Sequence, residues 1–383
     1  MIIAKRASEQ STAALPSIQM LRAVAALAVL FCHLKMSLNW FGYSPNPLPA
    51  FVLGGAGVDL FFVISGFIMV YTSERLFAQP GAPQRFFSRR LIRILPLYWA
   101  LTTIAVFGWH GLTLPWHLTW TNVIGSYLLI PTMRPGGTSP ASTAPELVQA
   151  WTLYYEMFFY AMFAAVIVLP RRLAVIALSL FFVVIVSATQ LIGSKELSVP
   201  WNIWSVPIIY EFVFGMWVAL ALRAGWRVHP AICCVVTVTA VAFMAVAAQF
   251  DLVNGQPMTS TYSRPLIWGT GTALVVACFA LADVTQPVPM LFKPLVIVGD
   301  ASYALYLFHT FVPYGLHAVH APRIIDPAVH PFVYSALTAA IAIASALVLN
   351  VGDQKCRTWL LAKSQLRPAL VIDRAQPSSR VAA

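Results

Sequence analysis

The sequence predicts an all-α, polytopic membrane protein: a transmembrane helix bundle of about ten spans with both termini in the cytoplasm. Of its 383 residues, 59% are hydrophobic and only 10% are charged, and the mean hydropathy is +0.77. This composition excludes a soluble globular domain. The apolar residues also gather in long runs, many close to the ~20 residues that cross a bilayer core of ~30 Å.

Ten of these runs are candidate spans, and an eleventh, 120–130, is too short to cross and is expected to be interfacial or re-entrant. The candidate spans are 17–38, 51–72, 91–109, 148–169, 173–192, 204–222, 230–250, 264–283, 294–316 and 331–351. They divide the chain into a cytoplasmic N-terminal segment (1–16), a membrane domain (17–351) and a basic cytoplasmic tail (352–383). The N-terminus lacks the features of a cleaved signal peptide, so the first span is expected to stay as a signal anchor.

The basic residues predict the orientation of this bundle. Counted over alternate connections, 18 Lys and Arg fall on the side of the termini and five on the other side, while Arg22 lies within a span. Such an excess marks the cytoplasmic face. The net charge of +11 is therefore mainly a topology signal, and no nucleic-acid partner is expected.

The cysteines show neither the paired spacing of extracellular disulfides nor the spacing of a metal site. They are Cys32, Cys233, Cys234, Cys278 and Cys356. We therefore expect no disulfide, no zinc and no other metal.

The first span carries two ionisable residues, Arg22 and His33. Such a group in the bilayer core costs ~2.5 kcal/mol or more, and it normally faces protein or a wet cavity and has a function. Eleven residues are three helical turns plus ~20°, so both side chains leave one face of the helix, ~16 Å apart along its axis. The alternative is that each snorkels to an opposite interface.

Four further titratable residues lie at a similar depth. At ~1.5 Å per residue, Asp59, Glu156 and Glu211 lie ~10–12 Å below the outer edge, and His33 and His309 lie ~22–24 Å from the inner edge. Because buried charges need partners, we expect one polar cavity in the outer half of the membrane. Separate structural pairs are the alternative.

A cluster of arginines, RFFSRRLIRILPLYW (85–99), marks the cytoplasmic mouth of the third span. Guanidinium groups bind phosphate in bidentate fashion, so Arg89, Arg90 and Arg93 are candidates to hold an anionic cofactor. The alternative is an anchor on anionic lipid headgroups.

Two other stretches have both a functional and a plain interpretation. The glycines of GGAGVDLFFVISGFIM (54–69) are expected to allow close helix packing around Asp59, and Ser65 within it is either a nucleophile or, more simply, a packing or hydrogen-bonding residue. The Pro-, Gly- and Ser-rich connection 110–147 is either a flexible, substrate-facing loop or a linker.

Six motifs in order resemble the acyltransferase-3 family of integral-membrane acyltransferases, over roughly residues 17–350. They are Arg22 with His33, GVDLFFVISGFIM (57–69), RRLIRILPLYW (89–99), WTLYYEMFFY (151–160), YEFVFGM (210–216) and GDASYALYLFHT (299–310). The chain looks most like the bacterial exopolysaccharide O-acetyltransferases. It has Thr152 where the family often has Ser, which keeps the hydroxyl group.

The resemblance implies a multi-pass protein of the bacterial inner membrane, with cytoplasmic acetyl-CoA as acyl donor. The acceptor would be a hydroxyl of a cell-surface or exported polysaccharide or its lipid-linked precursor, and membrane lipids and the polysaccharide assembly machinery would be partners. Arg22 and His33 match the family's essential arginine and histidine, Arg90 and Arg93 its basic motif, and Asp59, Glu156 and His309 its polar positions.

These roles predict a mechanism. Arg89, Arg90 and Arg93 would bind the CoA phosphates, with Arg22 further along the same cofactor path, and His33 would act as general base on the acceptor hydroxyl. Asp59 or Glu156 would orient the His33 ring. Tyr303, Ser302 or a backbone amide would stabilise the oxyanion. Further contacts with substrate or transition state are expected from Ser65, Tyr155, Glu211, Ser302, Tyr303 and His309; a covalent relay through Ser65 or Ser302 stays open.

Three alternatives remain from the sequence. A proton-coupled transporter would explain the buried charges but not the arginine cluster. The acceptor could be a small secondary metabolite, a lipid or a peptidoglycan sugar. The acyl group could be succinyl or longer, because nothing in the sequence measures the acyl pocket.

Overall fold

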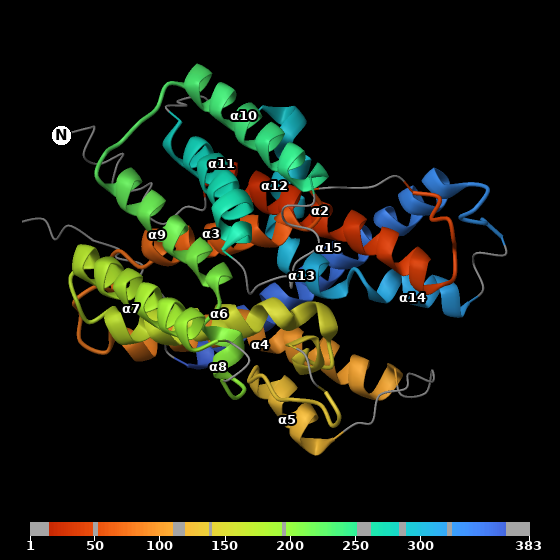
Figure 1. Ribbon diagram of the computed structural model, residues 1–383, viewed down its shortest axis with the longest axis horizontal. Coiled ribbons are helices and arrows are strands. Elements are labelled where there is room, and N and C mark those ends of the chain that lie inside the picture. Colours follow the sequence, from red (N-terminus) through yellow and green to blue (C-terminus); the bar gives the residue numbers. More distant parts are fainter. Residues whose placement is uncertain are drawn as a thin grey trace, which may run out of the picture.

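The computed structural model describes residues 15–48, 53–109, 119–137, 140–193, 197–250, 262–282, 289–319 and 324–364. Within these ranges the chain is helical and contains no β-strand, apart from an isolated bridge between Val228 and Ala282. The predicted all-α class is confirmed. Figure 1 shows α2 and α3 crossing the middle of the molecule, with α10 and α11 on one side and α7 on the other.

The helices follow the apolar runs of the sequence. The longer ones are α2 (Pro16–Trp40), α3 (Ala56–Thr72), α4 (Ala82–Trp109), α6 (Trp151–Val166), α7 (Arg171–Ile192), α9 (Tyr210–Arg223), α10 (Pro230–Gln249), α11 (Thr270–Leu281) and α15 (Pro331–Lys363). The shorter ones are α5 (Trp120–Leu128), α8 (Trp201–Trp204), α12 (Lys293–Asp300), α13 (Ser302–Phe308) and α14 (Phe311–Ala318). A π-helical turn, Pro265–Gly269, leads into α11, and 3₁₀ turns lie at Pro140–Thr143, Val148–Ala150, Pro207–Ile209 and Met290–Phe292.

Five of the described helices are long and apolar enough to cross a membrane. They are α2, residues Ala82–Gly108 of α4, α7, α10 and α15; the pair Met290–Asp300 and Ser302–Phe308, bent by 55°, counts as a sixth if it is one broken span. The other predicted spans contain helices too, but α3, α6, α9 and α11 have 12 to 17 residues. The count of ten spans and the cytoplasmic position of the termini stay predictions, and residues 1–14 and 365–383 lie outside the described part.

The centre of the bundle depends on close packing at glycines. A Cβ atom on Gly66 of α3 would lie 2.0 Å from the carbonyl oxygen of Phe212, and one on Gly215 of α9 would lie 1.9 Å from that of Val63. No side chain fits there, so the backbones of α3 and α9 touch directly. The packing role predicted for the glycines of residues 54–69 is confirmed at Gly66.

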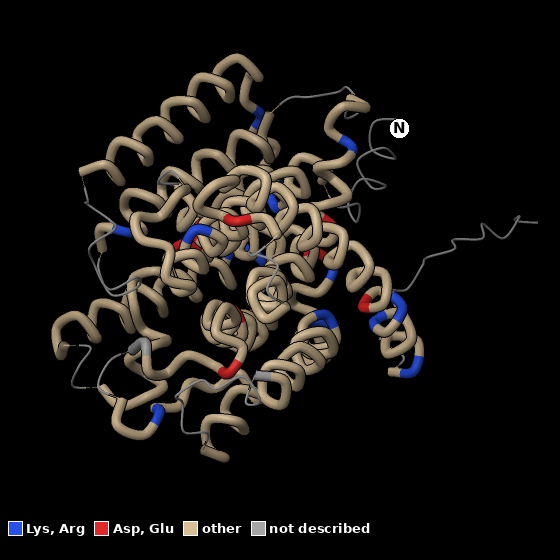
Figure 2. The backbone as a smooth tube through the Cα atoms, turned by 90° about the vertical axis from the view of Figure 1, so that its right-hand side faces the viewer, with Lys and Arg blue, Asp and Glu red and all other residues tan. Residues whose placement is uncertain are grey.

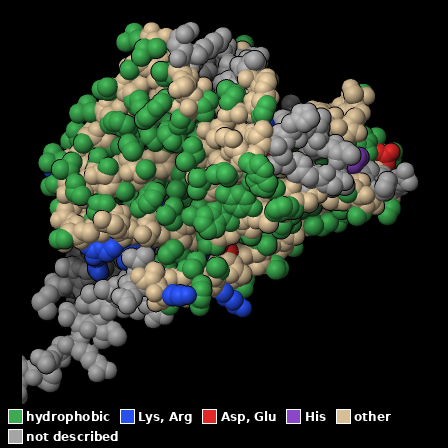
Figure 3. Space-filling model, turned by 90° about the horizontal axis from the view of Figure 1, so that it is seen from below, with side chains coloured by type: hydrophobic (Ala, Val, Ile, Leu, Met, Phe, Trp, Pro, Cys, Tyr) green, Lys and Arg blue, Asp and Glu red, His purple; other side chains and the backbone are tan. Residues whose placement is uncertain are grey.

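The surface carries the character expected of a membrane protein. Hydrophobic side chains cover most of the face in Figure 3, and Lys and Arg gather along one margin of it. In Figure 2 charged residues are sparse, and several lie within the bundle rather than at its edge. On the predicted cytoplasmic side, Glu74 binds Arg171 at 3.0 Å and Arg223 at 2.7 Å. Glu74, just after α3, thus links the start of α7 to the end of α9.

The short run predicted to be interfacial forms α5. Its residues Trp120, Ile124 and Leu128 are four apart and are exposed by 81%, 55% and 59%. Four-residue spacing places them on one helix face. An exposed apolar stripe of this kind fits a helix that lies along a bilayer surface.

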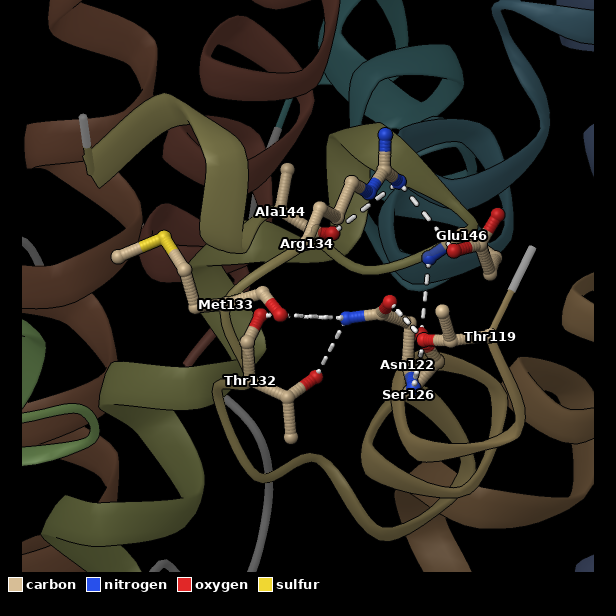
Figure 4. A network of polar contacts seen from close by, with 8 residues as sticks. All are labelled: Thr119, Asn122, Ser126, Thr132, Met133, Arg134, Ala144 and Glu146. Atoms are coloured by element: carbon tan, nitrogen blue, oxygen red, sulfur yellow. Dashed lines mark hydrogen bonds and ion pairs between the residues drawn. The ribbon is translucent and has the colours of Figure 1, made fainter. Parts of the chain in front are cut away.

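Polar contacts join α5 to the chain that follows it, up to Glu146 (Figure 4). Asn122 donates to the hydroxyl of Thr132 at 3.0 Å. Arg134 forms an ion pair with Glu146 at 3.3 Å, and the Glu146 amide donates to Ser126. Residues 119–137 and 140–147 thus form a helix and turns that these contacts tie together; whether the connection is a flexible, substrate-facing loop or a linker stays a prediction, and residues 110–118, 138 and 139 lie outside the description.

Candidate active site

A cavity of about 80 Å³ opens between α2, α3, α4, α6 and α13. One water needs ~10–15 Å³ measured this way, so the cavity admits several water-sized groups. Its polar lining consists of Arg22, Ser65, Arg90, Arg93, Thr152, Glu156, Tyr160, Ser302, Tyr303 and Tyr306. Three guanidinium groups face one carboxylate, so the cavity favours a negatively charged ligand.

Arg22 is fixed where α2 meets the start of α13. Its Nε and Nη2 donate to the Ser302 hydroxyl at 3.1 and 2.9 Å. The end of α12, just before α13, approaches α2 closely because Gly299 lies directly against the backbone of Gln19, where a Cβ would be 1.9 Å from the carbonyl oxygen. Arg22 therefore faces protein and the cavity, and it does not snorkel to an interface. Since Ser302 accepts both bonds, its own O–H stays free to donate.

The arginine cluster of α4 divides between the cavity and its surroundings. Arg90 donates to Thr72 at 3.1 Å and lies over the rings of Phe86 and Tyr160, 5.4 and 5.9 Å from their centroids. Arg93 lines the cavity beside it. Arg89 is half-buried and is not among the described lining residues, so the structure brings together two of the three predicted phosphate ligands.

Glu156 forms a hydrogen-bonded group on the opposite wall. The hydroxyls of Ser65 and Tyr160 both donate to its Oε1, the former at 3.1 Å. A buried carboxylate requires such donors. Tyr160 was missed by sequence reasoning, although its position four residues after Glu156 on one helix placed the two side chains together.

Tyr303 and Tyr306 of α13 point their hydroxyls at backbone carbonyls. Tyr303 donates to Ile94 and Tyr306 to Gln149, each at 2.8 Å. The O–H of Tyr303 is thus bonded to the backbone in this conformation, and its role as oxyanion donor stays a prediction. Ser302 remains a candidate. Tyr306 was not predicted, and its hydroxyl also lies 2.9 Å from Thr152.

His33 and His309 form a pair of imidazoles. Their ring centroids are 4.9 Å apart and the planes meet at 70°. The Nδ1 of His33 lies 3.0 Å from the carbonyl oxygen of Val29, and that of His309 lies 2.7 Å from that of Tyr306. A carbonyl accepts only from N–H, so both rings carry hydrogen on Nδ1 and an acceptor lone pair on Nε2. The Nε2 of His309 is buried without a partner among the described residues.

The imidazole pair lies beyond the cavity lining, not within it. Tyr306 connects the two sites: it lines the cavity, and its ring centroid is 6.1 Å from that of His309. On α2, Arg22 borders the cavity while His33 lies eleven residues further along. The arrangement is therefore an arginine-lined cavity at one end and two free imidazole nitrogens at the other.

Asp59 lies elsewhere, in a buried ion pair. Arg264 binds both its oxygens, with Nε–Oδ1 at 3.0 Å and Nη2–Oδ2 at 2.7 Å, and lies over the ring of Trp268 at 5.2 Å. Asp59 is therefore not the group that orients His33, and Glu156 is not either, because the backbone carbonyl of Val29 has that position. Arg264 was counted in the sequence only as an outer-loop cation.

Glu211 belongs to the same buried cluster and is fully inaccessible. It is close enough to Asp59 and Arg264 to interact electrostatically with both, and Gly269 lies against its side chain. Tyr155 packs between the rings of Phe62 and Trp151. Neither Glu211 nor Tyr155 is among the described lining residues. The single cavity predicted for all the titratable groups is replaced by three neighbouring clusters.

The comparison with known proteins shows the family of the chain. Residues 15–351 match the acyltransferase domain of the acyltransferase-3 family. The chain is 35% identical over 264 residues to the exopolysaccharide production protein ExoZ of Rhizobium meliloti (strain 1021), covering 68% of this chain and 77% of ExoZ. It is 28% identical over 323 residues to the acyltransferase MdmB of Streptomyces mycarofaciens, covering 78% and 79%. No solved structure matches. Because the match takes in nearly the whole helical bundle, the chain belongs to the acyltransferase-3 family and is an acyltransferase.

Proposed function

We propose that the protein is an O-acetyltransferase of the bacterial inner membrane. It moves the acetyl group of cytoplasmic acetyl-CoA to a hydroxyl of a cell-surface or exported polysaccharide, or of its lipid-linked precursor. The observation that carries this proposal is the arginine-lined cavity that leads, through Tyr306, to two imidazoles with free Nε2 atoms.

The arginines support a phosphorylated donor. Arg22, Arg90 and Arg93 outnumber the one carboxylate of the cavity, and guanidinium groups are the side chains best suited to phosphate oxygens. In the predicted orientation the arginines of α4 lie toward the cytoplasm, where CoA is available. The phosphates would bind at this end and the pantetheine arm would carry the thioester toward Tyr306 and the imidazoles.

The imidazoles support base catalysis of direct transfer. The acceptor O–H gives its proton to Nε2 of His33 while its oxygen attacks the thioester carbonyl carbon. The C–O bond forms, the C–S bond breaks, and the CoA thiolate takes the proton from the imidazolium, so atoms and charge balance. His309 can share the proton through its own Nε2. Of the predicted oxyanion donors, Ser302 lies beside Arg22 at the arginine end of the cavity, so a backbone amide remains for the thioester carbonyl near the imidazoles.

The proposed acceptor is based on the name of one relative, ExoZ. ExoZ is an exopolysaccharide production protein, and its likeness over two thirds of this chain favours a polysaccharide hydroxyl here. Membrane lipids and polysaccharide assembly proteins would then be the natural neighbours of the enzyme.

The test is acetyl-CoA turnover by the purified protein in nanodiscs, measured as free CoA thiol with and without fragments of the host polysaccharide. We expect acceptor-stimulated release that is lost in His33→Ala and kept in His330→Ala, an exposed histidine before α15. Equal release from wild type and His33→Ala would overturn His33 as base. Binding of acetyl-CoA in the absence of any transfer would separate a wrong acceptor from a wrong donor.

A further inference from the structure

The cytoplasmic end of α15 carries a buried ion pair that the mechanism above does not use. Arg357 Nη2 lies 3.0 Å from Asp353 Oδ2, and only 2% of the Asp353 side chain is exposed. The second carboxylate oxygen, Oδ1, and the Nε of Arg357 have no hydrogen-bond partner among the described residues. Both residues lie beyond position 351, where the match to the family model ends.

This pair borders the cavity at its arginine end. Asp353 and Arg357 each interact electrostatically with Arg93, and Arg357 also with Tyr303. Arg93 and Tyr303 both line the cavity. The position is fixed, because Tyr303 donates to the carbonyl of Ile94, the residue after Arg93, and α15 packs against both α4 and α13.

The charges at this point favour an anion. Two guanidinium groups, of Arg93 and Arg357, flank one carboxylate, which leaves a positive excess in a partly dry site. A guanidinium has five N–H donors, and the contact with Asp353 uses one of those of Arg357. The carboxylate holds the side chain in one orientation, so less conformational entropy is lost when a ligand takes the remaining donors.

We propose that Arg357, oriented by Asp353, joins Arg93 in binding the phosphate groups at the nucleotide end of the acyl-CoA donor. This inference rests on the proposed function, because it names a further residue of the donor site. Arg357 is a binding residue and Asp353 a positioning residue. The same chemistry would suit the phosphate of an anionic lipid headgroup, and the test separates the two sources.

The test compares donors that are shortened from the nucleotide end: acetyl-CoA, acetyl-dephospho-CoA, which lacks only the ribose phosphate, and S-acetylpantetheine, which lacks the whole phosphorylated nucleotide. Wild type, Arg357→Gln and Asp353→Asn are assayed in nanodiscs of zwitterionic lipid and, in parallel, in nanodiscs that contain an anionic phospholipid. We expect Arg357→Gln to raise KM for acetyl-CoA at least tenfold with kcat little changed, and to leave S-acetylpantetheine unaffected. Asp353→Asn should raise KM for acetyl-CoA in the same direction, and Arg357→Lys should restore part of the loss. The matched control is Lys355→Gln, an exposed cation on the same helix, which should change nothing.

Several outcomes would overturn the inference. An equal effect of Arg357→Gln on all three donors would make the residue structural, and an effect seen only with anionic lipid would assign it to a headgroup. If wild type turns over no donor, the proposed function fails first. Equilibrium binding of CoA to wild type and Arg357→Gln then decides the inference, since equal affinity would reject it.

Discussion

The edge of the His33 ring faces His309 at a centroid distance of 4.9 Å, and each ring is held through Nδ1 by a carbonyl of its own helix. The helical backbone thus does what a carboxylate does in a catalytic triad: it fixes the tautomer and leaves Nε2 as acceptor.

Replacing His309 by Asn tests this pairing. The Asn amide can still donate to the Tyr306 carbonyl, but it removes the second imidazole acceptor. We expect kcat to fall roughly tenfold or more, within the range of general-base effects, with KM for acetyl-CoA unchanged. His330→Asn serves as control. A rise in KM alone would place His309 in donor binding instead.

Arg22→Lys tests the contact with Ser302. Lysine keeps the charge but cannot place two nitrogens on one hydroxyl as Arg22 does at 3.1 and 2.9 Å. We expect KM for acetyl-CoA to rise by about fivefold to tenfold, which corresponds to ~1 to 1.4 kcal/mol. Ser302→Ala should shift KM in the same direction if the hydroxyl positions the guanidinium. Steady-state kinetics that match wild type would refute this role of Arg22.

Glu156→Gln removes the negative charge of the cavity and keeps its shape. The hydroxyls of Ser65 and Tyr160 lose a charged acceptor, each such bond being worth ~1.5–3 kcal/mol, and the arginines lose their counter-charge. We expect a lower Tm without ligand and a larger rise in Tm on adding CoA, because its phosphates then supply the missing charge. Thermal unfolding followed by intrinsic fluorescence measures both, and an unchanged CoA-induced shift would contradict the electrostatic argument.

The Asp59–Arg264 pair is expected to stabilise the fold and not to catalyse. Asp59→Asn removes the carboxylate that binds Arg264 through two contacts and leaves only Glu211 near the guanidinium; breaking a buried pair costs ~3–5 kcal/mol, so the yield of folded protein should fall. The double variant Asp59→Leu/Arg264→Met removes both charges and should recover much of that stability. If it folds and still transfers acetyl groups, Asp59 is structural; a folded but inactive double variant would return Asp59 to the mechanism.

Gly66→Ala tests the contact between α3 and α9. The added Cβ would lie 2.0 Å from the Phe212 carbonyl oxygen, so the helices must separate, at a cost of ~1–3 kcal/mol or more. Gly315→Ala is the matched control, because nothing lies within 4 Å of its Cβ position. We expect a lower Tm for the first variant only. Equal Tm values would mean that the two helices can separate freely.

Much of the site was predictable from residue type and spacing. Arg22 and His33 stand out because charged groups in an apolar helix are costly, and their spacing puts them on one face. The same cost marked Glu156, Glu211 and His309, and the glycines of 54–69 marked close helix packing. The family motifs predicted acyltransfer, which the comparison confirms. These inferences depend on the chemistry of single helices, which the sequence determines by itself.

The partners of these residues were decided by the tertiary structure. The depth of each residue along its helix predicted that Asp59 lies near His33. Depth does not say which way a helix is turned about its axis, and the orientation of α3 directs Asp59 toward Arg264 instead. Tyr306 lies between the cavity and the imidazoles because α13 packs against α2 and because the Tyr306 hydroxyl contacts Thr152 of α6. From the sequence, Asp353 and Arg357 belong to the basic tail. In the structure they belong to α15, which packs against α4, the helix that carries Arg93. A sequence sets which groups are buried and at what height, whereas helix rotation and packing decide which of them meet.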